Sequence, residues 1–219
     1  MLQESTSLNI IEIFRSIQGE TSLAGLPTTF IRLAACNLRC TWCDTTYSFG
    51  RGVPETLQNI LSQVNSFGCQ YVCVTGGEPL LQSNVLPLMA KLCHEGYTVS
   101  LETGGSLATE LVDPQVHIIL DIKCPGSQMD HKNRWSNLDH LRSHDQVKFV
   151  IQDLQDYEYA KDICKNYQLF NKVNEILFSP VFGILNPQEL VQWILEDQLP
   201  VRLNLQMHKF IWSPDKKGV

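Results

Sequence analysis

Apolar and polar positions along this 219-residue chain follow two periods, and together they predict eight strands and four helices. Short apolar, β-branched runs followed by turn residues predict strands at 8–14, 29–35, 70–75, 97–102, 116–122, 146–151, 175–180 and 201–206. Apolar residues at helical spacing predict helices at 54–67, 82–95, 155–166 and 187–197. Pro54 and Pro187 suit a first helical position, whereas Pro87 should kink or shorten the second helix.

Strands that are apolar on both faces and alternate with helices predict a parallel sheet. The chain is short for a closed barrel of about eight strand–helix units. An open, partial β/α barrel of about six units, with the N-terminal strand added at an edge, fits the predicted elements. The predicted fold class is therefore α/β, with residues 1–219 forming one domain.

The predicted strands end in polar or glycine-rich residues. These are Cys36, Thr75, Gly76, Gly77, Glu78, Glu102, Thr103, Lys123, Gln152, Asp153, Ser179 and Pro180. Ligand sites of parallel α/β sheets gather at the carboxyl ends of the strands. We therefore expect these residues to converge on one site.

The composition is that of an ordinary globular protein, with 43% hydrophobic and 18% charged residues. The N-terminus, MLQESTSLNI, lacks the basic and apolar regions of a signal peptide. No apolar run approaches the roughly 18 residues that a membrane span needs. A net charge of −6 offers no basic surface for general nucleic-acid binding. We expect a cytoplasmic protein that acts on or binds a small ligand, without nucleic-acid or membrane partners.

Three of the eight cysteines, Cys36, Cys40 and Cys43, lie within the stretch AACNLRCTWCDT at 34–45. A disulfide framework is disfavoured because the chain is long, carries no export signal and clusters these cysteines too closely. Four of the others lie among apolar residues and should be small buried hydrophobes: Cys69, Cys73, Cys93 and Cys164. The pattern does not decide between a ligand and a core role for Cys124.

Thiolates at this spacing on a loop can hold zinc or an iron–sulfur cluster. A structural zinc site needs a fourth ligand, but the nearest histidine, His94, is some fifty residues away and no second C-x2-C pair exists. Three ligands on a four-iron cluster would leave one iron open to bind and activate another molecule. A zinc-binding module without catalysis stays open as an alternative at this point.

The stretch CNLRCTWCD at 36–44 resembles the cluster loop of the radical S-adenosylmethionine (SAM) enzymes, in which three cysteines hold a 4Fe–4S cluster and SAM binds the fourth iron. TGGEP at 75–79 is similar to the motif in which this superfamily holds the SAM amino group. The two motifs follow successive predicted strands. The resemblance implies a shortened, partial radical SAM barrel.

Further stretches are similar, in order and spacing, to the family of 7-carboxy-7-deazaguanine synthases. They are FRSIQGE at 14–20, FIRLAACNLRCTWCDT at 30–45, TGGEPLLQ at 75–82, ETGGS at 102–106, DIKCPGS at 121–127 and QMHKFIW at 206–212. The resemblance implies a lyase that converts 6-carboxy-5,6,7,8-tetrahydropterin to 7-carboxy-7-deazaguanine with loss of ammonia, a step towards queuosine. It also implies a homodimer that uses a 4Fe–4S cluster, SAM and Mg²⁺, with a SAM-derived radical starting the chemistry.

The same resemblance implies roles for individual residues. The cluster ligands would be Cys36, Cys40 and Cys43, and the Mg²⁺ ligand would be Thr45. The SAM site would comprise Trp42, Cys43, Asp44, Gly77, Glu78, Lys123, Ser127, Gln152 and Ser179. The substrate site would comprise Ile17, Gln18, Gly19, Glu20, Arg32, Thr75, His208 and Pro214. Because five residues follow Pro214, a role for it as the chain terminus is in question.

Several of these side chains also have plainer interpretations. Arg32 suits a substrate carboxylate but could instead be a structural ion-pair partner. Gln18 and Glu20 could be solvated turn residues, and His208 could be a packed or surface histidine. Thr45 could cap the segment that follows it.

Three clustered cysteines cannot build a second cluster, so we expect a flavodoxin or ferredoxin to supply the electron. The cluster and SAM would carry the chemistry, and no side chain is predicted to react itself. A glycyl-radical activating enzyme, which has a similar cluster loop but acts on a protein, is the alternative within the superfamily. The stretches QGE at 18–20 and HKFIW at 208–212 argue against it.

Overall fold

The computed structural model describes residues 6–219, which contain one nine-stranded sheet. The strands are β1 (Ser7–Ile17), β2 (Pro27–Leu33), β3 (Val53–Thr56), β4 (Tyr71–Gly76), β5 (Thr98–Thr103), β6 (His117–Ile122), β7 (Gln146–Ile151), β8 (Glu175–Pro180) and β9 (Arg202–Leu203). Their order is β3-β1-β2-β4-β5-β6-β7-β8-β9, and the seven strands from β2 to β9 are mutually parallel. The sheet does not close, which confirms the predicted open α/β barrel.

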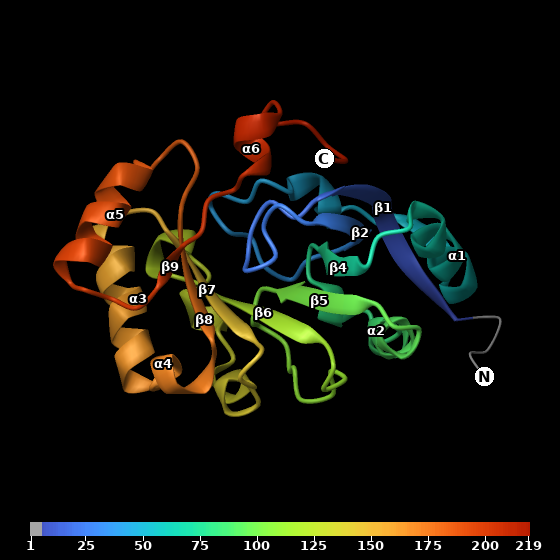
Figure 1. Ribbon diagram of the computed structural model, residues 1–219, viewed down its shortest axis with the longest axis horizontal. Coiled ribbons are helices and arrows are strands. Elements are labelled where there is room, and N and C mark those ends of the chain that lie inside the picture. The colour runs from blue at the N-terminus through green and yellow to red at the C-terminus, as the bar shows by residue number, and fades with distance from the viewer. Residues whose placement is uncertain (1–5) are drawn as a thin grey trace.

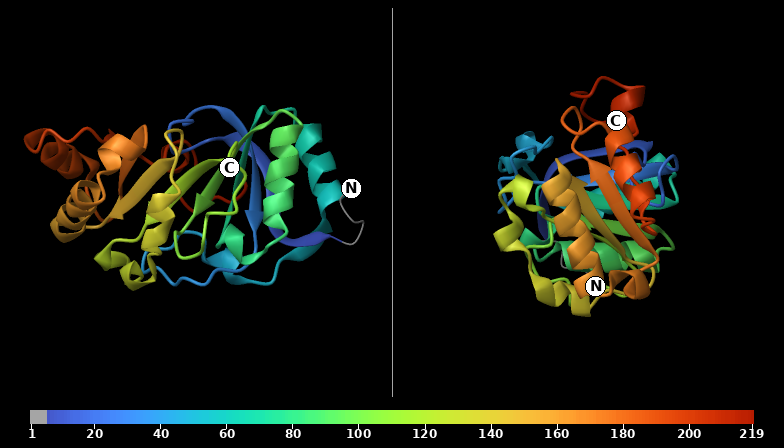
Figure 2. Two further views of the ribbon diagram at one scale, coloured as in Figure 1. Left: turned by 90° about the horizontal axis from the view of Figure 1, so that it is seen from below. Right: turned by 90° about the vertical axis from the view of Figure 1, so that its left-hand side faces the viewer.

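The helices are α1 (Leu57–Phe67), α2 (Val85–His94), α3 (Leu154–Asn166), α4 (Leu169–Lys172), α5 (Pro187–Glu196) and α6 (His208–Ile211). Helices α1 and α2 lie side by side at one end of the curved sheet, and α3, α4 and α5 lie at the other (Figures 1 and 2). Short 3-10 turns replace a helix between β6 and β7. No helix in residues 6–219 has the length and apolar character needed to cross a membrane.

The start of the chain differs from the prediction in two ways. Strand β1 is not at an edge, because it pairs antiparallel with β2 on one side and with β3 on the other. Pro54 does not begin a helix but lies in β3, at the edge of the sheet, where a residue without an N–H is tolerated. Helix α1 begins three residues later, after Thr56, whose side chain accepts a hydrogen bond from the Asn59 N–H.

The remaining helix boundaries follow the expected end signals. Helix α5 begins at Pro187, and the Asn186 side chain accepts a hydrogen bond from the Gln188 N–H. Helix α2 begins at Val85, so Pro87 lies in the first turn, where its missing N–H costs nothing, and the helix is shortened rather than broken. Strand β9 keeps only two of the six residues predicted at 201–206, because the chain then leaves the sheet.

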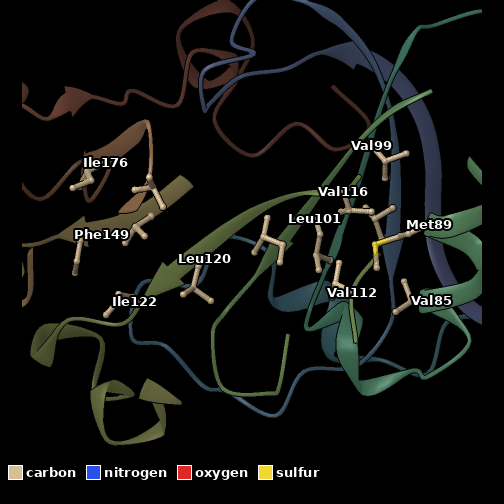
Figure 3. Close-up of a cluster of buried hydrophobic side chains, with 14 of the residues drawn as sticks. Val85, Met89, Val99, Leu101, Val112, Val116, Leu120, Ile122, Phe149 and Ile176 are labelled. Carbon is tan, nitrogen blue, oxygen red and sulfur yellow. The ribbon is translucent and has the colours of Figure 1, made fainter. Parts of the chain in front are cut away.

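The core lies between the outer face of the sheet and the helices. Val85 and Met89 of α2 point toward Val99 and Leu101 of β5 (Figure 3), and all four side chains are fully buried. Burying each such side chain stabilises the fold by about 1.5–3 kcal/mol. Four cysteines predicted to be buried hydrophobes are indeed buried, and so is Cys124: they are Cys69, Cys73, Cys93, Cys124 and Cys164.

Successive side chains along each strand point to opposite faces of the sheet, so every second side chain points to its inner face. In β6, Ile118, Leu120 and Ile122 join the outer core, whereas Ile119 and Asp121 point the other way and line a cavity. The inner face is therefore polar near the carboxyl ends of the strands. This polarity differs from the uniformly apolar strands that the sequence pattern suggested.

Candidate active site

A cavity of about 550 Å³ opens on the inner face of the sheet. Fifteen of the residues predicted for the site line it. They are Ile17, Gln18, Gly19, Glu20, Arg32, Cys36, Cys40, Trp42, Cys43, Asp44, Thr45, Thr75, Gly77, Lys123 and His208. These residues come from segments nearly 200 positions apart in the sequence. The strand-end pattern is confirmed only in part. The residues that line the cavity are Cys36, Thr75, Gly76, Gly77, Glu102, Thr103 and Lys123, and those that do not are Glu78, Gln152, Asp153, Ser179 and Pro180.

The strand register explains how charged side chains come together on the cavity floor. Arg32 of β2 is the direct partner of Thr75 on β4, and Asp121 of β6 is the partner of Lys148 on β7. Partners in parallel strands point to the same face. Glu102 lies on β5, between these two pairs, so the five neighbouring strands β2, β4, β5, β6 and β7 all present polar side chains to one space.

The cluster loop follows β2, and its three thiols are half-buried at the cavity wall. The Thr41 hydroxyl donates a hydrogen bond to the Gly126 carbonyl at 2.9 Å, which anchors the loop to the turn after β6. Burial raises the pKa of Cys36, Cys40 and Cys43, while the nearby Lys123 ammonium favours their thiolates.

The donor set fits a cluster better than a single ion. In residues 6–219, no three His, Cys, Asp or Glu side chains are grouped so that they could hold one metal ion. The three thiols nevertheless face one cavity and interact electrostatically with one another. A 4Fe–4S cluster is larger than a single ion and takes thiolate ligands that lie farther apart.

The TGGEP segment, which follows β4, packs directly on the start of the cluster loop. A Cβ atom on Gly77 would lie 2.0 Å from the Ala35 carbonyl oxygen, and one on Gly76 would lie 2.3 Å from that of Leu33. The N–H groups of Gly77 and Glu78 donate to these same two carbonyls. The glycine pair is therefore required for contact between two protein loops, whatever else it contacts.

Glu78 is fully buried and does not line the cavity. Its carboxylate accepts hydrogen bonds from the Leu80 N–H at 3.0 Å, the Thr103 hydroxyl at 2.9 Å and the Gly104 N–H at 2.8 Å. Burial raises the pKa of Glu78 although these donors favour its ionised form. The side chain thus joins the loop after β4 to the loop after β5.

Arg32 forms the structural ion pair that its plainer interpretation predicted, and it also lines the cavity. Its Nε donates to Glu12 at 2.8 Å, and its guanidinium lies between the rings of Phe14 and Tyr47. Neither terminal nitrogen of Arg32 has a hydrogen-bond partner among residues 6–219. An arginine held in this way leaves its planar end free to bind a carboxylate from the cavity.

The turn after β1 is not solvated, which excludes the plainer interpretation of Gln18 and Glu20. Gln18 is 3% exposed, and its amide donates to Glu102 at 3.4 Å while its oxygen accepts from the Glu20 N–H. The Glu20 carboxylate forms an ion pair with Lys148. Burial would raise the pKa of Glu20, but Lys148 and Gln206 outweigh it and lower the pKa.

The C-terminal segment closes the opposite wall of the cavity. Asp44 accepts hydrogen bonds from Lys209 at 2.8 Å and from Gln206 at 3.0 Å. His208 lies against Gly19, and its burial lowers its pKa. The Thr45 hydroxyl donates to Asp44 at 2.8 Å and makes no capping bond to the 3-10 turn that follows, so two oxygen-bearing side chains stand together here.

Four other predicted residues do not line the cavity. Ser127 is buried with its hydroxyl on the Cys124 carbonyl, and Ser179 is buried with its hydroxyl accepting from Asn204. The Gln152 side chain donates to Asp153 outside the cavity. Pro214 is exposed, and Val219 lines the cavity instead.

Glu102 and Thr103, which were expected at the site because they end a strand, line the cavity. Four other polar residues also line it, although the sequence suggested no role for them: Asp121, Lys148, Gln206 and Lys209. A usable signal existed for two of them, because Asp121 and Lys148 are lone charges in otherwise apolar strands. Asp121 is notable because, among the described residues, its Oδ1 is buried without a hydrogen-bond partner while Oδ2 pairs with Lys123 at 2.9 Å.

Comparisons with known proteins show the family and the fold of the chain. The chain matches the radical SAM superfamily over residues 30–167. It is 45% identical to the 7-carboxy-7-deazaguanine synthase of Koribacter versatilis, over 97% of this chain and 100% of that one. It is 46% identical to the 7-carboxy-7-deazaguanine synthase of Chlorobaculum tepidum, over 97% of each chain. The crystal structure of QueE from Escherichia coli shares the fold, with a TM-score of 0.76 at 21% identity over 92% of this chain and 95% of that one.

Proposed function

The chain belongs to the 7-carboxy-7-deazaguanine synthase family of the radical SAM superfamily, and from this membership we infer that it is a carbon–nitrogen lyase of 7-deazapurine synthesis. Its substrate is 6-carboxy-5,6,7,8-tetrahydropterin, which it converts to 7-carboxy-7-deazaguanine with loss of ammonia. One observation carries the proposal most directly. Three cluster-spaced thiols open onto the same cavity as a free arginine end and a buried Gln18–Glu20 turn.

The residues of the cavity fit the two cofactors of this family. Cys36, Cys40 and Cys43 would hold a 4Fe–4S cluster and leave one iron open for SAM. When bound, these groups supply the radical that starts the reaction. Trp42, Asp44, Gly77 and Lys123 would line SAM directly, because they face the cavity. Glu78, Ser127, Gln152 and Ser179 would shape that site from behind.

The substrate would lie toward the β1 turn and the C-terminal segment. The unpaired end of Arg32 suits the pterin carboxylate, which can accept two parallel N–H bonds. Ile17, Gln18, Gly19, Glu20, Thr75 and His208 would surround the pterin ring, since they line the remaining wall. Pro214 would act only by leading the chain toward the cavity.

The protein's further requirements are also proposed. Mg²⁺ would bind the Thr45 hydroxyl, which is supported by its place beside Asp44 at the cavity wall. Residues 1–219 would form one domain that works as a homodimer, as implied for the family. A flavodoxin or ferredoxin would supply the electron in the cytoplasm, because the remaining five cysteines are buried and offer no ligands for a second cluster.

The decisive experiment is anaerobic turnover of 6-carboxy-5,6,7,8-tetrahydropterin by the reconstituted enzyme with SAM, with and without Mg²⁺. We expect 7-carboxy-7-deazaguanine and ammonia in equal amounts, and a rate that falls when Mg²⁺ is removed. Arg32→Met should raise KM by about 10- to 100-fold, because a hydrogen-bonded charge is lost. Arg202→Met, which removes an arginine paired with Glu175 far from the cavity, is the control.

Two results would refute the assignment. Absence of turnover by a protein that carries an intact cluster and cleaves SAM would exclude this substrate. Installation of a glycyl radical in a partner protein would instead identify an activating enzyme.

A further inference from the structure

Lys148 is a charged residue of the cavity for which no sequence motif suggested a role. It lies on β7 and forms an ion pair with Glu20, in the turn after β1. The two side chains are only 16% and 13% exposed. The pair therefore joins the floor of the cavity to the turn that forms one of its walls.

The hydrogen bonds of Glu20 leave little of its carboxylate free. Oε2 accepts from Lys148 and from the Asn204 amide at 3.2 Å, and Oε1 accepts from the Gln206 amide at 3.1 Å. A carboxylate offers about four acceptor positions. One position therefore remains, on Oε1, so Glu20 can accept one N–H from a ligand but not a pair.

We propose that Lys148 is a positioning residue for the substrate, which keeps Glu20 ionised and oriented so that Oε1 accepts a single N–H from the amino or amide edge of the pterin. The identity of the ligand rests on the proposed function. The single acceptor position does not, because it follows from the protein contacts alone.

Electrostatics around the pair explain why a lysine is needed. Burial would raise the pKa of Glu20, and the charge and hydrogen bond of Lys148 are the main opposing effects. Burial would likewise lower the pKa of Lys148, but Glu20 and two other carboxylates raise it. The charged or titratable groups that face the pair from other segments are Asp44, Glu102, Asp121, Lys123 and His208.

Removing the lysine charge should make Glu20 easier to protonate. Its other hydrogen-bond partners, Asn204 and Gln206, are neutral, and Asp44 repels its negative charge. A buried carboxylate without a cation takes up a proton more readily. A protonated Glu20 carries no negative charge and accepts an N–H from a ligand more weakly, so binding would weaken.

The test uses Lys148→Met and Lys148→Arg in the reconstituted enzyme with SAM and 6-carboxy-5,6,7,8-tetrahydropterin. We expect Lys148→Met to raise KM about 10- to 100-fold, with a smaller effect on kcat, because a charge-assisted contact is lost. The increase should be larger at lower pH, where Glu20 is protonated. Lys148→Arg keeps the charge and should restore most of the affinity, which a merely space-filling role would not predict.

A double-mutant cycle with Glu20→Gln tests the coupling. The double variant should lose less than the sum of the two single losses, because it leaves no unpaired buried charge. Lys161→Met is the matched control, since Lys161 pairs with Glu158 and Asp197 outside the cavity. Iron and sulfide content and the visible absorption of each reconstituted variant show that it folds and carries the cluster.

Several results would overturn the proposal. They are an unchanged KM in Lys148→Met, equal losses in the Met and Arg variants, or additive losses in the cycle. If the wild-type enzyme cleaves SAM but does not convert the pterin, the proposed function fails instead. If the wild-type enzyme converts the pterin and the Lys148 variants have the same KM, only the role of Lys148 is refuted.

Discussion

Replacing Glu78 by alanine should destabilise the protein through the contacts between two loops. The carboxylate accepts from three donors, namely Leu80, Thr103 and Gly104, and it is fully buried. In Glu78→Ala, two backbone N–H groups lose their acceptor, and each buried unsatisfied donor costs about 1–3 kcal/mol. The variant no longer buries a carboxylate, which offsets part of this cost. We therefore expect the free energy of unfolding to fall by about 4 kcal/mol.

Thr103→Val is a milder substitution at the same contact. It removes the hydroxyl that donates to Glu78 and accepts a long bond from the Gly105 N–H at 3.4 Å, and it leaves both backbone bonds of Glu78, so we expect a loss of about 1–2 kcal/mol. Glu175→Ala is the control, because it removes a carboxylate that pairs with a half-exposed arginine, Arg202, and should cost less than about 1 kcal/mol.

The free energy of unfolding should be measured on cluster-free protein by anaerobic urea titration, since a bound cluster would add its own stabilisation. The expected order of destabilisation is Glu78→Ala, then Thr103→Val, then Glu175→Ala. A Glu78→Ala variant as stable as wild type would show that the carboxylate does not hold the two loops together. Equal losses in Glu78→Ala and Thr103→Val would show that the backbone donors contribute nothing.

Three further predictions concern other contacts. Gly19→Ala would place a Cβ atom 2.3 Å from the His208 ring, so we expect α6 to shift and KM for the pterin to rise about tenfold or more, as measured by steady-state kinetics. Burial lowers the pKa of His208 below its ordinary value of 6.5; its contribution to stability should be full above about pH 6.5 and lost as the pH falls through the lower folded-state pKa. Urea unfolding at two pH values should therefore show a smaller acid-induced loss in His208→Asn than in wild type, and an equal loss would contradict the prediction. Tyr157→Phe removes buried hydrogen bonds to Trp193 and Asp197 and should cost about 1–2 kcal/mol while leaving turnover unchanged, so reduced kcat would be the contrary result.

Local patterns in the sequence were sufficient for most of the elements and for locating the three-cysteine loop. Short apolar, β-branched runs located the parallel strands and helical spacing located the longer helices, because these patterns follow from backbone geometry within each segment. They failed at β3, where Pro54 suggested a helix, because pairing with β1 outweighed the local preference. The two short helices α4 and α6 were also missed, since four residues carry too little periodicity to detect.

The contents of the cavity depended on how the segments came together. The sequence pointed to Gln18, Glu20 and Arg32 only through a family resemblance, and their partners were not predictable from neighbouring residues. Glu20 meets Lys148 across 128 positions, and Thr21 meets Asn204 across 183. No local pattern encodes such pairs, because they arise when separate strands and loops are brought to one face.

The sequence alone therefore determined which residue types were available and which strand ends would carry them. The sequence showed three thiols at fixed spacing and a glycine pair after the next parallel strand, because the spacing within each motif is local. Only the tertiary structure decided that the glycines contact another loop, that Glu78 faces protein, and that Lys148 leaves Glu20 one free acceptor position. Those outcomes depend on strand register and on which face of the sheet is concave, and both are set by long-range packing.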